Sequence, residues 1–294
     1  MSARTAGASE RLLPNRGAVF CFGDPTYSTS GFAGDTTSKG WIRQAPFGHP
    51  SRVSYDDSVN VMQSLGCHTI RAELRSGDLD TNGGTINLRA QMYKYPSPKL
   101  YEALGTNRGQ TTWYGFAFST NAGYVPQSNP NAPNWNIVFS WHGTVAGGGN
   151  PMSLLVATKR VSTIACNHAT RYLRWPRTKP HLLLEVNGGD PTRWPIGGAT
   201  CLHFSGPVFV AGHRYRVQEK VKWSDDYRGA IQWWVDGVKY ADVKHICTLQ
   251  LGGDVYPVFQ NYRPFALSFP AAAIYYGGLV KGATRASVSV PVKR

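Results

Sequence analysis

The chain has 294 residues and carries 31 Lys and Arg against 17 Asp and Glu, which gives a formal net charge of +14 at pH 7. A field of that sign attracts polyanions such as uronate polysaccharides, nucleic acid or acidic surfaces. With 32 Gly, 19 Pro, 9 Trp, 15 Tyr and 12 Phe, the composition favours an all-β protein. No apolar run is long enough to span a bilayer, and the length suits one large β domain with tails.

Residues 1–16 combine small and charged residues without periodicity, which predicts a flexible or partner-bound arm. This segment lacks the apolar core of a secretory signal peptide. We expect the domain itself to span residues 17–267, with an early strand at 18–22.

Runs rich in β-branched and aromatic residues recur from residue 59 onward. Asp236-Gly237 lies between two such runs and predicts a two-residue hairpin, because both residues tolerate positive φ. Residues 225–229 predict a longer hairpin loop, and helix is limited to one or two turns at 97–104. The predicted strands are 67–75, 112–119, 135–142, 153–158, 181–186, 215–223, 230–235, 238–243 and 256–263.

Two further segments differ in composition from the rest of the chain. Residues 157–180 hold six basic residues with Tyr172 and Trp175 among them, which fits either a loop over an anionic ligand or a solvated basic loop. Residues 268–294 end in alternating Ser and Val, which predicts an edge strand or a docking tail to which a partner subunit could pair.

Three of the predicted strands alternate polar and apolar residues, so that alternate side chains project from one face about 6.5–7 Å apart. Arg71, Glu73 and Arg75 would project together from the first strand. Ser140 would project with His142, and Gln260 with Tyr262, from the other two. We expect these polar rows to line one groove.

In their order and spacing these patches resemble the jelly-roll polysaccharide lyases, which include alginate, glucuronan and heparin lyases. In that family an R-(S/T/A)-E-L-R strand, a Q-x-H strand and a Y-x-K-x-G-x-Y strand share the concave sheet. The resemblance implies a β-jelly-roll sandwich of two antiparallel sheets, with Arg71, His142 and Tyr262 as catalytic residues. Two positions depart from the pattern: Ser140 replaces the family's Gln, and Val258 replaces its Lys.

Lyases of this kind cleave uronic-acid chains by β-elimination, in which a base removes the proton beside the carboxylate. Arg71 would neutralise that carboxylate, His142 is a candidate base, and Tyr262 a base or acid. Ser140 is too short to replace a Gln amide, and Gln260 or Asn136 would have to supply it. The expected substrate-binding residues are Glu73, Arg75, Asn136, Ser140, Trp141, Gln260 and Arg263.

Structural interpretations compete with these assignments. Arg71 and Glu73 would also suit an ion pair within the sheet, and His142 would suit a histidine bonded to backbone. Trp233-Trp234 puts one indole on each face, one in the core and the other, with Trp113 or Trp141, available to stack on a sugar.

The five cysteines are widely separated, which favours buried thiols over a partial disulfide set. We expect no cofactor, since neither a Cys-x-x-Cys pair nor a ligand cluster indicates a metal. Two-carboxylate glycosidase chemistry lacks paired acids, serine hydrolysis lacks a G-x-S-x-G motif, and nucleic-acid binding lacks a basic helix or aromatic strand pair.

The predicted function is recognition of a polysaccharide or cell-surface glycan by a lyase-like protein, with β-elimination activity an open question. The resemblance extends to minor tail proteins of tailed phages, which implies a virion location, tail-subunit partners and no need for a signal peptide. A freestanding secreted lyase for an acidic polysaccharide and a purely structural virion subunit are the alternatives. A homo-oligomer is a further expectation.

Overall fold

The computed structural model describes most of the chain. The described residues are 11–12, 17–22, 26–27, 41–59, 61–62, 65–79, 86–94, 98–126, 135–145, 150–157, 179–190, 201–265 and 271–291. The predicted N-terminal arm, apart from residues 11 and 12, and nearly all of the basic segment 157–180 lie outside them.

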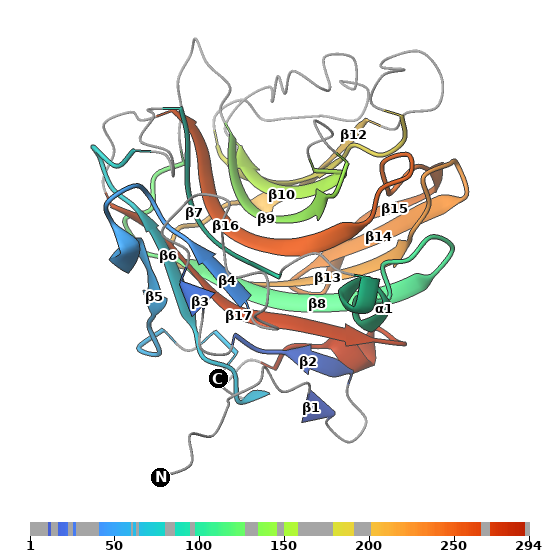
Figure 1. Ribbon diagram of the computed structural model, residues 1–294, viewed down its shortest axis with the longest axis horizontal. Helices are drawn as coiled ribbons and strands as arrows, with labels where there is room; N and C mark the ends of the chain where they lie inside the picture. Colours follow the sequence, from blue (N-terminus) through green and yellow to red (C-terminus); the bar gives the residue numbers. More distant parts are fainter. Residues whose placement is uncertain are drawn as a thin grey trace.

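Two β-sheets account for nearly all of the regular structure (Figure 1). Sheet A has nine strands, in the spatial order β1 (Arg11–Leu12), β2 (Ala18–Phe20), β17 (Ala272–Gly282), β8 (Thr111–Thr120), β13 (Arg214–Lys222), β14 (Gly229–Val235) and β15 (Val238–Ile246), while β6 (Ile70–Leu74) pairs with β17 and β5 (Val53–Tyr55) pairs with β6. Sheet B has eight, in the order β12 (Leu202–Val208), β11 (His181–Val186), β10 (Met152–Ala157), β9 (Trp135–Gly143), β16 (Val255–Phe265), β7 (Ile86–Lys94), β4 (Trp41–Gln44) and β3 (Thr26–Tyr27).

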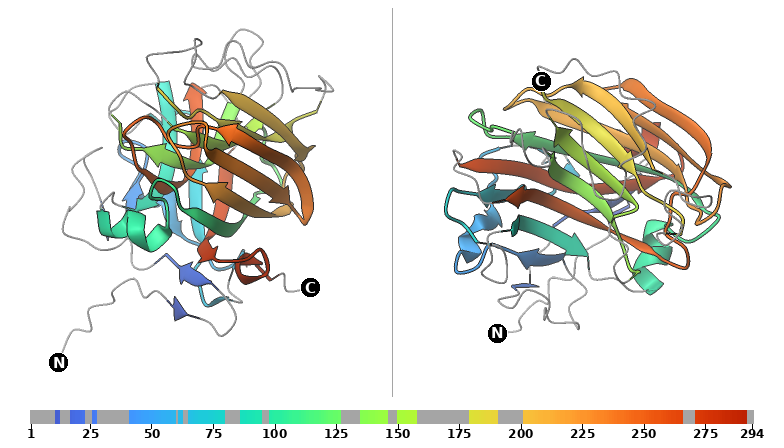
Figure 2. Two further views of the ribbon diagram at one scale, coloured as in Figure 1. Left: turned by 90° about the vertical axis from the view of Figure 1, so that its right-hand side faces the viewer. Right: turned by 90° about the horizontal axis from the view of Figure 1, so that it is seen from above.

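The sheets pack face to face as a jelly-roll sandwich, which confirms the predicted fold class (Figures 1 and 2). Among the strands that the structure describes, every pairing is antiparallel except that of β3 with β4. The described helices are one α-helix, α1 (Pro98–Leu104), and the 3-10 turns η1 (Pro50–Arg52) and η5 (Ala286–Val288), and none of these is long and apolar enough to cross a membrane. Sheet B is bent, and its concave side faces away from sheet A (Figure 1).

Aromatic side chains fill the space between the sheets. Phe259 of β16 meets Phe22 and Phe116 edge-on, with ring centroids 5.3 and 5.8 Å apart. Phe139 of β9 lies 4.4 Å from Phe116 of β8, so sheets A and B interdigitate here. Burial of each such ring stabilises the fold by about 1.5–3 kcal/mol. Because successive side chains of a strand point to opposite faces, the residues on either side of Phe259 in β16 must face away from sheet A.

Most sequence predictions of secondary structure are confirmed. Each predicted strand coincides with an observed one within a few residues, and α1 lies inside 97–104. The hairpin between β14 and β15 turns at Asp236 and Gly237, whose φ angles are 49° and 87°. The strands β1, β3, β4, β5, β7 and β12 were not predicted.

The prediction that 268–294 forms an edge strand or docking tail is wrong. β17 lies inside sheet A, where it pairs with β8 on one side and with β6 and β2 on the other. Its side chains Ile274, Tyr276 and Leu279 belong to the main core, so this segment is part of the domain.

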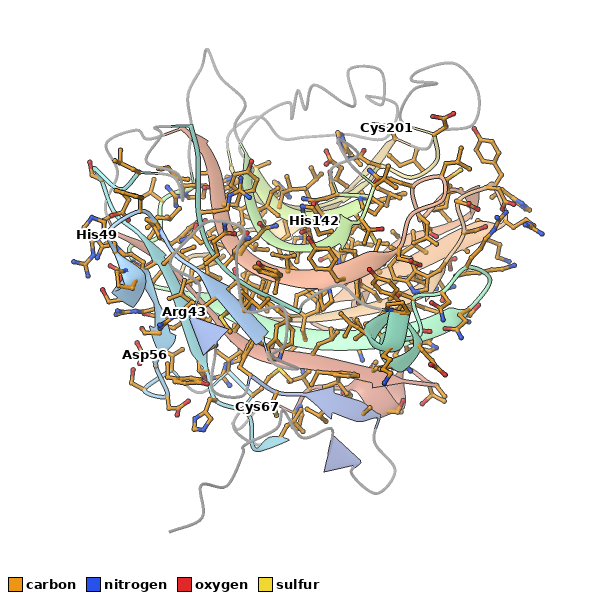
Figure 3. All side chains as sticks on the ribbon, viewed as in Figure 1. Arg43, His49, Asp56, Cys67, His142 and Cys201 are labelled. Atoms are coloured by element: carbon orange, nitrogen blue, oxygen red, sulfur yellow. A yellow bond between two sulfur atoms is a disulfide. The ribbon has the colours of Figure 1, made fainter. Side chains whose placement is uncertain are left out.

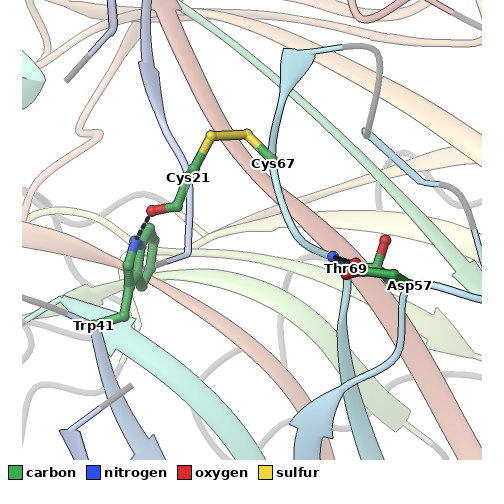
Figure 4. The surroundings of a disulfide bond; sticks show 5 residues. All are labelled: Cys21, Trp41, Asp57, Cys67 and Thr69. Carbon is green, nitrogen blue, oxygen red and sulfur yellow. Dashed lines mark hydrogen bonds between the residues drawn. A yellow bond between two sulfur atoms is a disulfide. The ribbon is translucent and has the colours of Figure 1, made fainter. Parts of the chain in front are cut away.

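A disulfide joins Cys21 to Cys67 (Figure 4). Around it, Trp41 donates its indole N–H to the Cys21 carbonyl at 2.8 Å, and the Thr69 amide donates to Asp57 at 2.8 Å. Cys201 is also disulfide-bonded, so the preferred expectation of buried thiols is wrong and the partial disulfide set is correct. Closing the 46-residue separation stabilises the fold by about 4 kcal/mol in the chain-entropy model.

One carboxyl group is buried between the sheets. Glu219 of β13 accepts a hydrogen bond of 3.0 Å from the indole N–H of Trp141 of β9. Burial raises the pKa of Glu219 to about 7, although the bond from Trp141 acts in the opposite direction. Between pH 4.5 and about 7, Glu219 therefore keeps its proton in the folded chain, whereas in the unfolded chain it has released it.

We expect the free energy of unfolding to fall by about 3 kcal/mol as pH rises from 4.5 to beyond 7, because ionising Glu219 then opposes folding. Glu219→Gln keeps an acceptor for Trp141 and should remove this part of the pH dependence. Urea unfolding across the window measures it, with Glu102→Gln on the exposed side of α1 as the control. An unchanged pH slope in Glu219→Gln would contradict the assignment.

Candidate functional site

The three central strands β7, β16 and β9 of sheet B place polar side chains on its concave side. Alternation puts Leu88, Ala90 and Met92 of β7 in the core, so Arg89, Gln91 and Tyr93 face outward. β16 pairs Tyr262 with Arg89 and Gln260 with Gln91 on one side, and Tyr256 with His142 on the other. Figure 3 marks His142 on the concave side of the bent sheet. The outward set, called the concave site below, is Arg89, Ser140, His142, Tyr256, Gln260 and Tyr262.

Arg89 is the cation of the concave site. Its guanidinium carbon lies 5.0 Å from the centroid of the Tyr262 ring, a cation–π contact. Among the described residues, other cations form the ion pairs, and none of these pairs includes Arg89. The buried Nε of Arg89 has no hydrogen-bond partner. A partly buried guanidinium without a carboxylate is a site for an external anion.

His142 is held as a neutral imidazole. Its Nδ1 lies 2.8 Å from the Gly143 carbonyl, so Nδ1 carries the hydrogen and Nε2 keeps its lone pair. Its ring stacks on Tyr256 with centroids 5.1 Å apart. Burial lowers the pKa of His142, the Gly143 bond opposes that shift, and the charge of Arg89 lowers it further. His142 is therefore suited to accept a proton at neutral pH.

Two tyrosines of β16 complete the acid–base groups. Burial raises the pKa of both Tyr256 and Tyr262, and the charge of Arg89 partly offsets this. Both phenols are protonated at neutral pH and can donate a hydrogen. Tyr262 is anchored by an apolar cluster on the same side of sheet B, formed by Ile137, Leu155, Ala157 and Leu183.

An amide supports the floor of the site. Gln260 donates from Nε2 to the Ser140 hydroxyl at 2.9 Å, and both side chains are buried. Ser140 can in turn donate its own hydrogen. The Gln260 amide thus lies next to residue 140, where the Q-x-H pattern of the lyases has a Gln.

The expectation that Arg71 shares one groove with His142 and Tyr262 is wrong. β6 belongs to sheet A, where it pairs with β17, and its alternate residues Ile70, Ala72 and Leu74 are in the core. Arg71 and Glu73 therefore point outward from sheet A, away from the concave site. They form an ion pair of 3.3 Å, and Arg75 also binds Glu73, as the competing structural interpretation expects.

Three other predicted binding residues face the interior. Trp141 is buried in the core and donates to Glu219. Asn136 is fully buried and donates to the Val156 carbonyl at 3.4 Å. Arg263 is buried over the Tyr124 ring at 5.0 Å and donates to the Val125 carbonyl. For these three the predicted contact with a ligand is wrong.

Sequence reasoning missed Arg89 and Tyr256. The signal for Arg89 was present, because Leu88 to Tyr93 alternates apolar and polar residues in the same way as the predicted strands. Tyr256 is two residues before Val258 on the face that carries Gln260 and Tyr262. The sequence pattern could not show that β7 pairs with β16, which is what brings Arg89 next to Tyr262.

A second polar group lies further along the same side of sheet B. Glu185 of β11 accepts hydrogen bonds from Asn187 at 2.7 Å and binds His203 of β12 at 2.8 Å. Both Glu185 and His203 are buried, and the carboxylate is fully engaged. Among the described residues no group of three His, Cys, Asp or Glu side chains could hold a metal ion.

Comparison with known proteins agrees with this architecture. The polysaccharide lyase family model matches residues 33–261. The endo-β-1,4-glucuronan lyase of the fungus Trichoderma reesei is similar in structure at 17% identity, with a TM-score of 0.57 over 80% of this chain and 88% of that enzyme. An alginate lyase bound to an alginate trisaccharide has 14% identity and a TM-score of 0.50, over 84% of this chain and 88% of its own. No curated protein sequence matches significantly.

We expect Arg89→Gln to raise the pKa of His142, because it removes a positive charge that opposes protonation of the imidazole. NMR titration of the His142 ring measures the shift. Arg75→Gln is the matched control, since Arg75 lies on sheet A and should leave that titration unchanged. Equal His142 titration in both variants would show that Arg89 does not act on the imidazole.

Proposed function

This chain belongs to the polysaccharide lyase family, and we propose that it cleaves an acidic polysaccharide by β-elimination at the concave site. The observation that carries the proposal is the Arg89 guanidinium, which contacts the ring of the protonated Tyr262 and whose charge acts on the neutral His142. These are the groups that the reaction needs: a cation for the uronate carboxylate, a base and an acid. The net charge of +14 favours an anionic substrate.

In the proposed reaction Arg89 binds the carboxylate of the sugar that loses a proton. The carboxylate gains negative charge as the adjacent C–H bond breaks, and a fixed guanidinium stabilises that charge. Nε2 of His142 takes the proton. The electron pair forms a carbon–carbon double bond and expels the glycosidic oxygen on the neighbouring carbon.

Tyr262 donates its phenolic hydrogen to the departing oxygen. The phenolate that remains lies beneath the Arg89 guanidinium, which stabilises it until a proton returns from solvent. Tyr256 positions the imidazole by stacking on it. The Gln260 amide, held by Ser140, supplies the polar group that the family pattern places at position 140.

We further propose that the protein acts outside the cell that makes it. Its disulfides support this, because disulfides persist in oxidising surroundings. A minor tail protein of a phage, acting on host surface polysaccharide beside other tail subunits, is the setting that the sequence resemblance favours. A secreted free enzyme is the alternative, and assembly with particle components distinguishes the two.

The test is turnover of uronate polymers, followed by the ultraviolet absorbance of the unsaturated product. We expect steady growth of that signal with the wild-type chain. His142→Ala and Tyr262→Phe should each lower kcat by about 10²–10⁴, as loss of an acid or base does. Arg89→Gln should lower kcat/KM by about 10²–10³.

Matched controls are Arg75→Gln and Tyr227→Phe, which change the same residue types far from the concave site and should retain activity. If no uronate polymer yields product while the protein still binds one, the site recognises glycan without cleaving it. Equal activity of His142→Ala and the wild type would refute the proposed base.

A further inference from the structure

The outer face of sheet A is basic along β13. β13 alternates core residues with outward polar ones, and Tyr215, Val217 and Val221 are in the core. The outward residues of this one strand are Arg214, Arg216, Gln218, Lys220 and Lys222. Successive members of such a row lie about 6.5–7 Å apart, so four cations line one strand.

Two tryptophans flank the row. Trp113 of β8 pairs with Lys220 in register, and Trp234 of β14 pairs with Gln218. The two indoles stack across β13 with centroids 5.1 Å apart. Lys220 lies 5.6 Å from the Trp113 ring, and Arg285 lies 4.8 Å from the Trp234 ring. The tryptophans therefore hold cations in place on the surface.

A hollow lies on each side of the stacked pair. One, of about 170 Å³, is lined by three lysines together with Thr111, Gln232 and Asp242; the lysines are Lys220, Lys222 and Lys244. The other, of about 400 Å³, is lined by Arg216, Gln218, Arg285 and Ser289. Each hollow combines cations with neutral hydrogen-bonding groups.

The acids on this face do not neutralise the row. Asp236 binds Arg216 and His213, and Asp242 binds Lys239 at 2.7 Å. Among the described residues, none of the contact ion pairs involves Arg214, Lys220, Lys222 or Lys244. These four cations are available to an external polyanion.

We propose that the outer face of sheet A, at the Trp113–Trp234 pair and the two basic hollows, is a second binding site for an acidic polysaccharide. Regularly spaced cations suit a polymer with a carboxylate on each sugar, and the partly exposed Trp113 offers an apolar surface for a sugar ring. The site lies on the opposite side of the sandwich from the concave site, so one polymer could engage it while another stretch is cleaved. The choice of an acidic polysaccharide as the ligand rests on the proposed function, whereas the presence of a site for a polyanion on this face does not.

The test uses His142→Ala as background, so that the polymer stays intact. In that background we compare Lys220→Gln/Lys222→Gln with the control Lys99→Gln/Arg75→Gln, which removes the same charge from other surfaces. Binding of polyuronate is measured by calorimetry at low and at physiological salt. We expect about tenfold weaker binding in the first variant only, with a smaller salt dependence.

A second comparison separates this proposal from the catalytic one. With His142 intact, Lys220→Gln/Lys222→Gln should turn over short uronate oligosaccharides at the wild-type rate and should lose efficiency only on long chains. If wild-type protein cleaves nothing, the binding comparison still decides the second site. Equal polymer binding by both double variants would overturn the proposal, as would preferential binding of a nucleic-acid duplex over polyuronate.

Discussion

The two-residue alternation of β16, held between β7 and β9, is the constraint on which both the core and the concave site depend. Phe259 must point inward to meet Phe22 and Phe116, and this fixes Gln260 and Tyr262 on the outward side. The pairing with β7 then brings Arg89 to Tyr262. A slip of one residue would bury Tyr262 and expose Phe259, so the hydrophobic core specifies the register of the concave-site residues.

Alternation read from the sequence was reliable within a strand and unreliable across irregularities. Trp141 precedes the outward residue His142 and Arg263 follows the outward residue Tyr262, so strict alternation places both inside, where the structure has them. Asn136 differs, because its even spacing from Ser140 predicts an outward side chain. The register shift of β9 against β10 beside residue 138 adds one residue, which turns Asn136 inward.

Partner choice between strands was the part that one sequence could not supply. Arg71 in β6 and Arg89 in β7 both lie in alternating segments, and nothing local distinguishes them. The difference is non-local: β6 pairs with β17 of sheet A, whereas β7 pairs with β16 of sheet B. Most strands, the Asp236 hairpin and the common face of Gln260 and Tyr262 followed from local pattern, the jelly-roll fold followed from the family resemblance, and the position of Arg89 required the sheet order.

The shortage of acids in the described strands of sheet B fits the chemistry proposed for the concave site. A carboxylate beside Arg89 would neutralise the guanidinium and would also raise the pKa of His142, so the site would lose both its anion-binding group and its neutral base. Glu185, the one acid within the described strands of sheet B, lies on β11 and is already bound by His203 and Asn187. Glu219 is on sheet A, directed into the core toward Trp141. Within the described strands of sheet B, no carboxylate therefore pairs with Arg89, and in the proposed function a uronate carboxylate supplies that anion.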